Sequence, residues 1–211
     1  MTEPVHHASD AMLAACAAGA LPYPFAMLVA AHVSLCDECR AGLEAHRVLG
    51  GLVLDALAPA ALAPGARAWA LAALDAGQPA LPARAGDTAY PAPISGLIGA
   101  EGPRWRGLGF GAKQAILWSG AAGSLRLLSI PAAQAVPEHG HRGLELTLVL
   151  SGAFADETGL FRAGDLEVAA EELNHTPRAT DEGPCLCLAA TDAPLRFRAI
   201  IPRILQPIFR I

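Results

Sequence analysis

The chain of 211 residues has few charged and few aromatic side chains. Charged residues make up 17% of it and aromatic residues 5%, against 53% hydrophobic residues. A hydrophobic fraction of this size can bury a core, which argues against global disorder. The net charge is −5 at pH 7 and no basic cluster stands out, so we expect no direct binding to nucleic acid. The length suits one large domain or two small ones.

Signals for export and for membrane insertion are also missing from the sequence. The opening residues, MTEPVHHASD, contain no basic segment, so we expect no signal peptide. The apolar stretch from Met12 to Leu35 is broken by Pro22 and Pro24, whereas a membrane span needs about 20 uninterrupted apolar residues. Five cysteines, an odd number that includes two close pairs, fit poorly with a secreted disulfide framework. We therefore expect a cytoplasmic protein.

The hydrophobic pattern changes in character along the chain. Helical spacing predicts helices over 10–18, 24–49 and 66–75. Short apolar runs between turn residues then predict strands, over 115–118, 125–130, 144–150, 164–168, 185–189 and 195–201. The prediction is a two-domain protein: a small all-α helical bundle (1–78), a Pro/Ala-rich linker (79–95) and an all-β barrel or sandwich (96–211).

The first motif with metal-binding character is His32-x3-Cys36-x2-Cys39. If residues 24–49 form one helix, these three side chains share a face. Four-coordinate zinc accepts one imidazole and two thiolates and needs one further ligand, for which His6 and His7 are the nearby candidates. The alternative is a pair of core cysteines beside an unrelated histidine.

The second motif is His139-x-His141-x3-Glu145. Side chains alternate along a strand, so these three residues of equal parity are expected to point inward together. His175 follows where a returning strand could supply a fourth ligand. Such a set suits zinc, or Fe, Mn or Ni. The alternative is a solvated strand face, but the neighbouring run LELTLVL reads as a buried strand, where a lone charge would be costly.

Other cysteine and tryptophan residues carry less information. Cys185 and Cys187 lie two apart on a predicted strand and face the same side. We favour core packing over a redox pair for them, because such neighbours would be strained in a disulfide. We expect Trp69, Trp105 and Trp118 to anchor the core or an interface.

Five stretches of the sequence carry a resemblance to a known family. The chain resembles the zinc-binding anti-sigma domain and, more closely, the ChrR type of anti-sigma factor. The stretches are HHASDAMLAACAAG (6–19), AAHVSLCDECRAG (30–42), HGHRGLELTLVLSGAF (139–154), CLAATDAPLRF (187–197) and LQPIFRI (205–211). The resemblance implies that the second histidine of the opening pair is the ligand, so that the first zinc site comprises His7, His32, Cys36 and Cys39.

The segment from His139 to Glu145 resembles the first of the two conserved cupin motifs. His175 then corresponds to the histidine of the second cupin motif. The resemblance implies a cupin fold, a double-stranded β-helix or jelly roll, with His139, His141, Glu145 and His175 around a second metal, for which zinc is expected. Ala133 and Ala179 depart from the usual glycine and asparagine of these motifs.

The function that the resemblance implies is regulatory and not enzymatic. The N-terminal zinc domain would bind and inhibit an alternative sigma factor of the extracytoplasmic-function type, as a 1:1 heterodimer. The cupin-like domain would release it in response to singlet oxygen or oxidative stress. Two alternatives remain at this point: a metal-dependent cupin oxygenase or isomerase with an accessory zinc module, and a barrel that senses a small effector.

Overall fold

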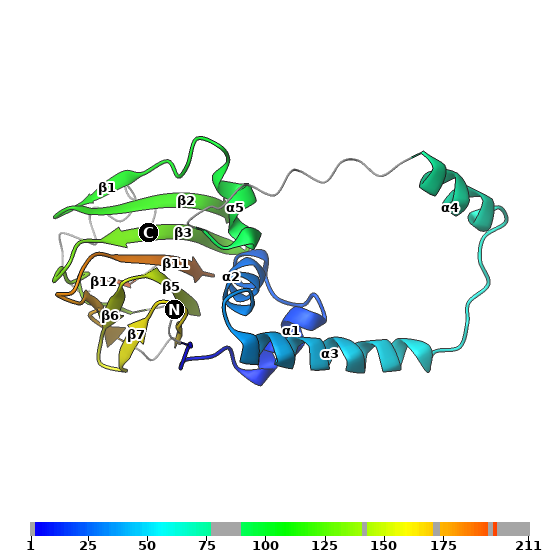
Figure 1. The fold of residues 1–211 in the computed structure, drawn as a ribbon, viewed down its shortest axis with the longest axis horizontal. Coiled ribbons are helices and arrows are strands. Elements are labelled where there is room, and N and C mark those ends of the chain that lie inside the picture. The colour runs from blue at the N-terminus through cyan, green and yellow to red at the C-terminus, as the bar shows by residue number, and fades with distance from the viewer. Residues whose placement is uncertain (1–2, 77–89, 141–142, 171–173, 194–195, 198–211) are drawn as a thin grey trace.

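The computed structural model of the chain describes residues 3–76, 90–140, 143–170, 174–193 and 196–197. Its helices are α1 (Asp10–Ala17), α2 (Tyr23–Val33), α3 (Asp37–Asp55), α4 (Ala66–Asp75) and α5 (Ala92–Ile98). Figure 1 shows α1, α2 and α3 packed at one end of a β domain, while α4 stands apart. Among the described residues, no helix combines the length and the apolarity that a membrane crossing requires.

Two of the predicted helices are confirmed. Ser9 caps α1, because its side-chain oxygen accepts a hydrogen bond from the Met12 N–H at 3.3 Å. The helix predicted over 66–75 is α4, which begins directly after Gly65 in the left-handed conformation (φ 82°). Helical spacing was sufficient to predict both.

The single helix predicted over 24–49 is wrong, because α2 ends at Val33 and α3 begins at Asp37. Cys36 lies between them with an extended backbone (φ −121°, ψ 113°) and caps α3, its sulfur accepting a hydrogen bond from the Cys39 N–H at 3.5 Å. Apolar spacing continues smoothly across the break, so periodicity alone did not reveal it. The three residues of the first motif therefore do not share one helical face.

The β domain is antiparallel throughout its described ladders. A six-stranded sheet has the order β1-β2-β3-β11-β5-β8, and two three-stranded sheets have the orders β10-β6-β7 and β12-β4-β9. The strands are β1 (Arg106–Gly109), β2 (Ala112–Gly120), β3 (Gly123–Ile130), β4 (His139–Gly140), β5 (Glu145–Ser151), β6 (Ala153–Ala155), β7 (Leu160–Arg162), β8 (Leu166–Ala169), β9 (Asn174–His175), β10 (Arg178–Ala179), β11 (Cys185–Thr191) and β12 (Arg196–Phe197). Each predicted apolar run overlaps one of these strands, although 195 and 198–201 lie outside the described residues.

The helices and the large sheet share one hydrophobic core. Helix α2 packs against β3, β5 and β11. Leu28 and Val29 of this helix are fully buried in the same cluster as Leu125, Leu127 and Leu148 of the sheet. Because a common core joins them, the helical region and the β domain are packed as one unit at this contact, and not merely tethered.

The predicted linker also ends earlier than expected. Its segment 77–89 lies outside the described residues, but α5 begins at Ala92, and Ile94 is fully buried against the shared core. Pro91 and Pro93 fall within the predicted linker, 79–95. They instead occupy the cap and the first turn of α5, where the missing N–H of proline breaks no helical hydrogen bond.

Candidate functional site

The first cluster forms where three segments meet. His7 precedes α1, His32 lies in the last turn of α2, and Cys36 and Cys39 lie at the start of α3. The Nδ1 atom of His7 is 3.3 Å from the Cys36 sulfur and 3.7 Å from the Cys39 sulfur, and the Nε2 atom of His32 is 3.3 Å from the Cys39 sulfur. All four donor atoms lie within 4.8 Å of one another. The structure thus brings together the whole predicted set.

The chemistry and spacing of these donors fit a tetrahedral zinc ion. Metal–ligand bonds of about 2.0–2.3 Å put the donor atoms of a tetrahedron about 3.6 Å apart, close to the contacts in this cluster. Burial lowers the pKa of His32, which favours the neutral imidazole that a metal requires. Burial also raises the pKa of Cys39 to about 11, so a cation beside this thiol would be needed to ionise it near neutral pH.

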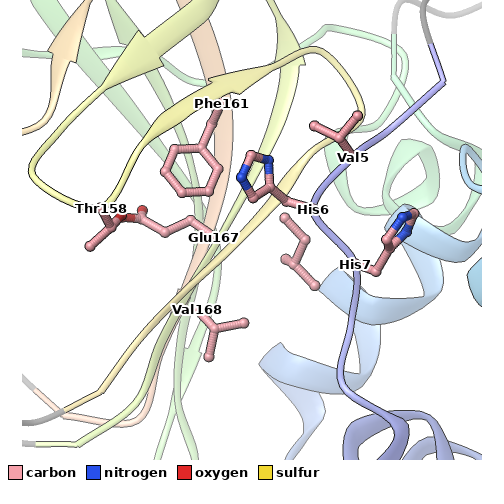
Figure 2. A pocket seen from close by; sticks show the side chains of 8 residues that line it. Val5, His6, His7, Thr158, Phe161, Glu167 and Val168 are labelled. Carbon is pink, nitrogen blue, oxygen red and sulfur yellow. The ribbon is translucent and has the colours of Figure 1, made fainter.

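His6 takes a different direction from His7. Its ring lies against Phe161 of the β domain, with centroids 4.5 Å apart, and its Nδ1 atom is 3.4 Å from an Asp165 carboxylate oxygen. Figure 2 shows the two imidazoles on opposite sides of the N-terminal segment, with His6 toward Phe161. Of the two candidates left open by the sequence, His7 is the one in the cluster.

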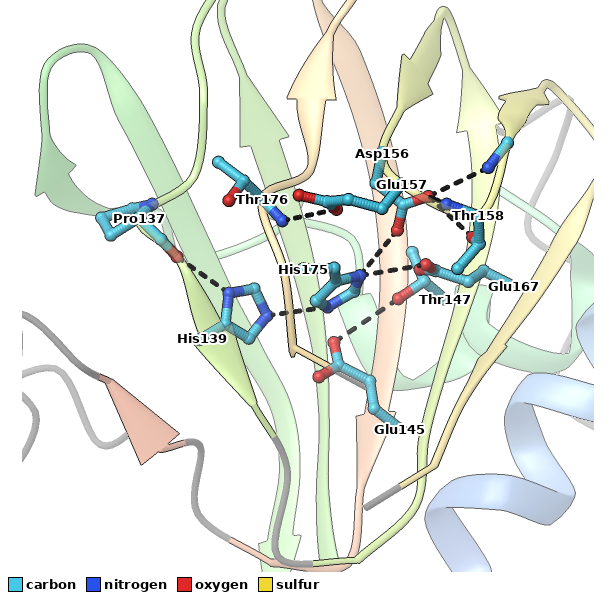
Figure 3. A network of polar contacts seen from close by, with 11 residues as sticks. Pro137, His139, Glu145, Thr147, Asp156, Glu157, Thr158, Glu167, His175 and Thr176 are labelled. Carbon is cyan, nitrogen blue, oxygen red and sulfur yellow. Dashed lines mark hydrogen bonds and ion pairs between the residues drawn. The ribbon is translucent and has the colours of Figure 1, made fainter. Parts of the chain in front are cut away.

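The second cluster is centred on two facing imidazoles. His139 on β4 and His175 on β9 are direct neighbours across the ladder, and their Nε2 atoms are 3.2 Å apart (Figure 3). Each ring has an acceptor at its other nitrogen, because Nδ1 of His139 is 2.9 Å from the Pro137 carbonyl oxygen and Nδ1 of His175 is 2.7 Å from an Asp156 carboxylate oxygen. If both Nδ1 atoms donate, the two Nε2 lone pairs face each other. Only a shared proton or a metal ion between them makes that arrangement favourable.

The other two predicted ligands are placed differently. Glu145 is buried at the start of β5, where Thr147 donates a hydrogen bond to it at 3.4 Å, and His141 lies outside the described residues. The prediction that residues 139, 141 and 145 share one strand is wrong, because β4 and β5 belong to different sheets. Glu145 nonetheless acts electrostatically on His175, whose pKa it raises.

Asp156 and Glu167 are site residues that the sequence did not indicate. Their carboxylate oxygens lie 2.7 Å and 3.2 Å from Nδ1 of His175, and the three side chains form a second group with donor atoms within 4.8 Å. Burial raises the pKa of Glu167 to about 7. Burial opposes a charge on His175, but Glu167 and Asp156 together raise its pKa to about 9. No spacing motif joins these residues, which meet only through strand pairing.

Cys185 and Cys187 pack in the core, as predicted. Both are buried free thiols with sulfur atoms 3.3 Å apart, in a cluster that includes Val149 and Phe154. The hydrogen bond from Cys185, followed by burial, raises the pKa of Cys187 well above its ordinary value. Neutral thiols of this kind react slowly.

Large apolar side chains gather on the outside of α3, the following loop and α4. We call this the α3–α4 apolar surface; its exposed members are Val48, Leu49, Leu52, Val53, Leu54, Leu57, Leu62, Trp69, Leu71 and Leu74. Trp69 is 74% exposed, so it anchors no core within the described chain, unlike Trp118, whose ring packs at 5.1 Å from that of Tyr23.

Comparisons with known proteins cover both parts of the chain. Residues 98–193 match the family model described as the ChrR cupin-like domain. The anti-sigma-E factor ChrR of Cereibacter sphaeroides is 54% identical over 209 residues, which is 98% of each chain. A solved structure of Rhodobacter sphaeroides SigE in complex with the anti-sigma ChrR contains a similar chain. That chain is 52% identical with a TM-score of 0.79, and the match covers 90% of this chain and 100% of that one.

Proposed function

The chain belongs to the ChrR family of anti-sigma factors, which are regulators and not enzymes, and we propose that it binds and inhibits an alternative sigma factor. The sigma factor is of the extracytoplasmic-function type and forms a 1:1 heterodimer with the chain through the helical region. The complex acts in the cytoplasm, where sigma factors engage RNA polymerase. DNA contacts belong to the sigma factor, in keeping with the acidic net charge of −5.

The observation that carries this proposal is the α3–α4 apolar surface. Large apolar side chains exposed in such number mark interaction sites on soluble proteins. Within the described chain, α4 buries none of its ten residues, although eight of them are alanine, leucine or tryptophan, which suit an interface. Two apolar helices joined by a loop can lie against separate domains of one partner, so that its DNA-binding and polymerase-binding surfaces are masked together.

A direct binding measurement tests the proposal. The purified full chain is mixed with SigE of Rhodobacter sphaeroides, and the complex is analysed by size-exclusion chromatography with light scattering. We expect a 1:1 complex and loss of SigE-dependent transcription in vitro. Free SigE activity at micromolar concentrations of the chain would contradict the proposal.

Zinc at His7, His32, Cys36 and Cys39 holds the helical region together in this proposal. The ion ties the N-terminal segment to α2 and α3, so that its binding energy contributes directly to folding. A second metal, for which zinc is expected, is held by His139, His141, Glu145 and His175. Metal analysis of the full chain should give two ions per molecule. A value of one ion per molecule would show that the barrel residues hold no metal.

The β domain receives the signal, which we propose is singlet oxygen. Imidazole groups are electron-rich and are attacked by this oxidant, and two of them, His139 and His175, face each other in the barrel cluster. We expect His139→Ala and Glu145→Ala to lose induction of a sigma-dependent reporter by light and a photosensitiser, whereas Asp181→Ala at an exposed turn keeps it. Normal induction in both site variants would exclude this site as the sensor. Release by a small molecule without oxidant would instead favour an effector-sensing barrel.

A further inference from the structure

The N-terminal segment that carries His7 is held by the β domain. The Asp165 side chain, which is 2% exposed, accepts hydrogen bonds from the backbone N–H groups of Val5 at 2.7 Å and His6 at 3.0 Å. Its other oxygen accepts one from the Arg162 N–H at 2.8 Å. The Leu166 N–H also donates to the His6 carbonyl oxygen at 3.1 Å. Both backbone groups of the residue directly before His7 are therefore bonded to one turn of the β domain.

The same turn contacts a second residue of the first cluster. Nδ1 of His32 donates to the carbonyl oxygen of Gly164 at 3.0 Å, and its Nε2 atom faces the Cys39 sulfur at 3.3 Å. A donor bond at Nδ1 selects the tautomer whose free lone pair is on Nε2, the atom that would bind zinc. The turn lies close to the N-terminal segment, because a Cβ atom added to Gly164 would come within 2.9 Å of Pro4. The outer partner of His7, by contrast, is Glu38 of α3 at 3.4 Å.

We infer that the turn at Gly164 and Asp165 is the outer shell of the N-terminal zinc site, so that the β domain positions two of its four ligands. Gly164 sets the orientation of the His32 ring, and Asp165 sets the path of the chain into His7. The inference rests on the proposed zinc site and adds a physical connection between that site and the β domain. Two residues further along, Glu167 on β8 contacts Nδ1 of His175 at 3.2 Å. A short segment of one strand and its turn thus joins the two histidine clusters.

The alkylation rate of Cys36 and Cys39 reports how firmly the β domain holds the first zinc site, independently of the second cluster. The full chain, loaded with zinc, is treated with N-ethylmaleimide, and the modification of Cys36 and Cys39 is followed by peptide mass spectrometry. Asp165→Ala should weaken zinc binding about 10- to 100-fold, the range found when outer partners of metal ligands are removed, and should speed the modification of both thiols accordingly. Asp165→Asn keeps an oxygen toward Val5 and His6 and should recover most of the protection.

Two further variants separate positioning from general damage. Asp181→Ala removes an exposed carboxylate of the same domain and should protect the thiols as the unmodified chain does. Val5→Pro removes one N–H donor and leaves the β domain untouched, so it should also speed modification several-fold without changing the thermal unfolding of that domain. Rates within twofold of the unmodified chain for both Asp165→Ala and Val5→Pro would overturn the inference alone. Absence of zinc protection in the unmodified chain would overturn the proposed zinc site together with it.

Discussion

Replacing Trp69 by alanine should weaken SigE binding about 70-fold and leave the folded state unharmed. Trp69 lies on α4 and is 74% exposed, which corresponds to about 180 Å² of accessible surface for a tryptophan. Alanine at the same position would expose roughly 100 Å² less. At about 25 cal/mol per Å², full burial of that difference in a complex is worth about 2.5 kcal/mol, which converts to the expected change in Kd.

Stability should respond much less to this substitution than binding does. Exposed side chains without partners usually contribute within about 0.5 kcal/mol, so chemical denaturation of Trp69→Ala should match that of the unmodified chain. Phe110→Ala is a matched control, because Phe110 is an aromatic residue that is 89% exposed in the turn between β1 and β2, outside the α3–α4 apolar surface. Its Kd for SigE should stay within twofold.

The assay is titration calorimetry of each full-length variant with SigE at fixed salt. A Kd for Trp69→Ala within threefold of the unmodified chain would refute the assignment of α4 to the interface. A loss of more than about 1 kcal/mol of unfolding free energy would refute the claim that Trp69 contributes nothing to the free fold.

Three further outcomes follow from the clusters and the shared core. Cys39→Ala should abolish SigE binding through misfolding of the helical region, and intact binding with unchanged far-ultraviolet circular dichroism would contradict a structural zinc. Leu28→Ala should cost about 3 kcal/mol of unfolding free energy, because it leaves a cavity between α2 and the sheet, and a single denaturation transition should be retained. In the metal-free chain, burial opposes a charge on His175, yet Glu167 and Asp156 raise its pKa from 6.5 to about 9. The resulting stabilisation is complete below about pH 6.5 and is lost as the pH rises toward 9, so thermal unfolding of the metal-free chain should move to lower temperature over that window. Constant or increasing stability there would show that His175 is not charged.

The sequence by itself determined the features that depend on neighbouring residues. The helix after Ser9, the helix after Gly65 and the short strands are local, so spacing and turn residues were enough to predict them. The resemblance was carried by short motifs, and it identified the family together with the set His7, His32, Cys36 and Cys39. Two imidazoles and two thiols are typical zinc ligands, so the residue types alone predicted metal binding.

The tertiary structure decided what depends on residues far apart in the chain. The break at Cys36 places the first cluster at the junction of two helices, where a continuous apolar pattern had predicted one. Asp156 and Glu167 reach His175 only because strands from distant segments lie side by side. The sequence around a carboxylate does not indicate which imidazole it will contact. The bonds from Asp165 to the N-terminal segment span about 160 residues, so only packing of the helices on the sheet could bring the first cluster to the turn that precedes β8, the strand whose Glu167 contacts the second cluster.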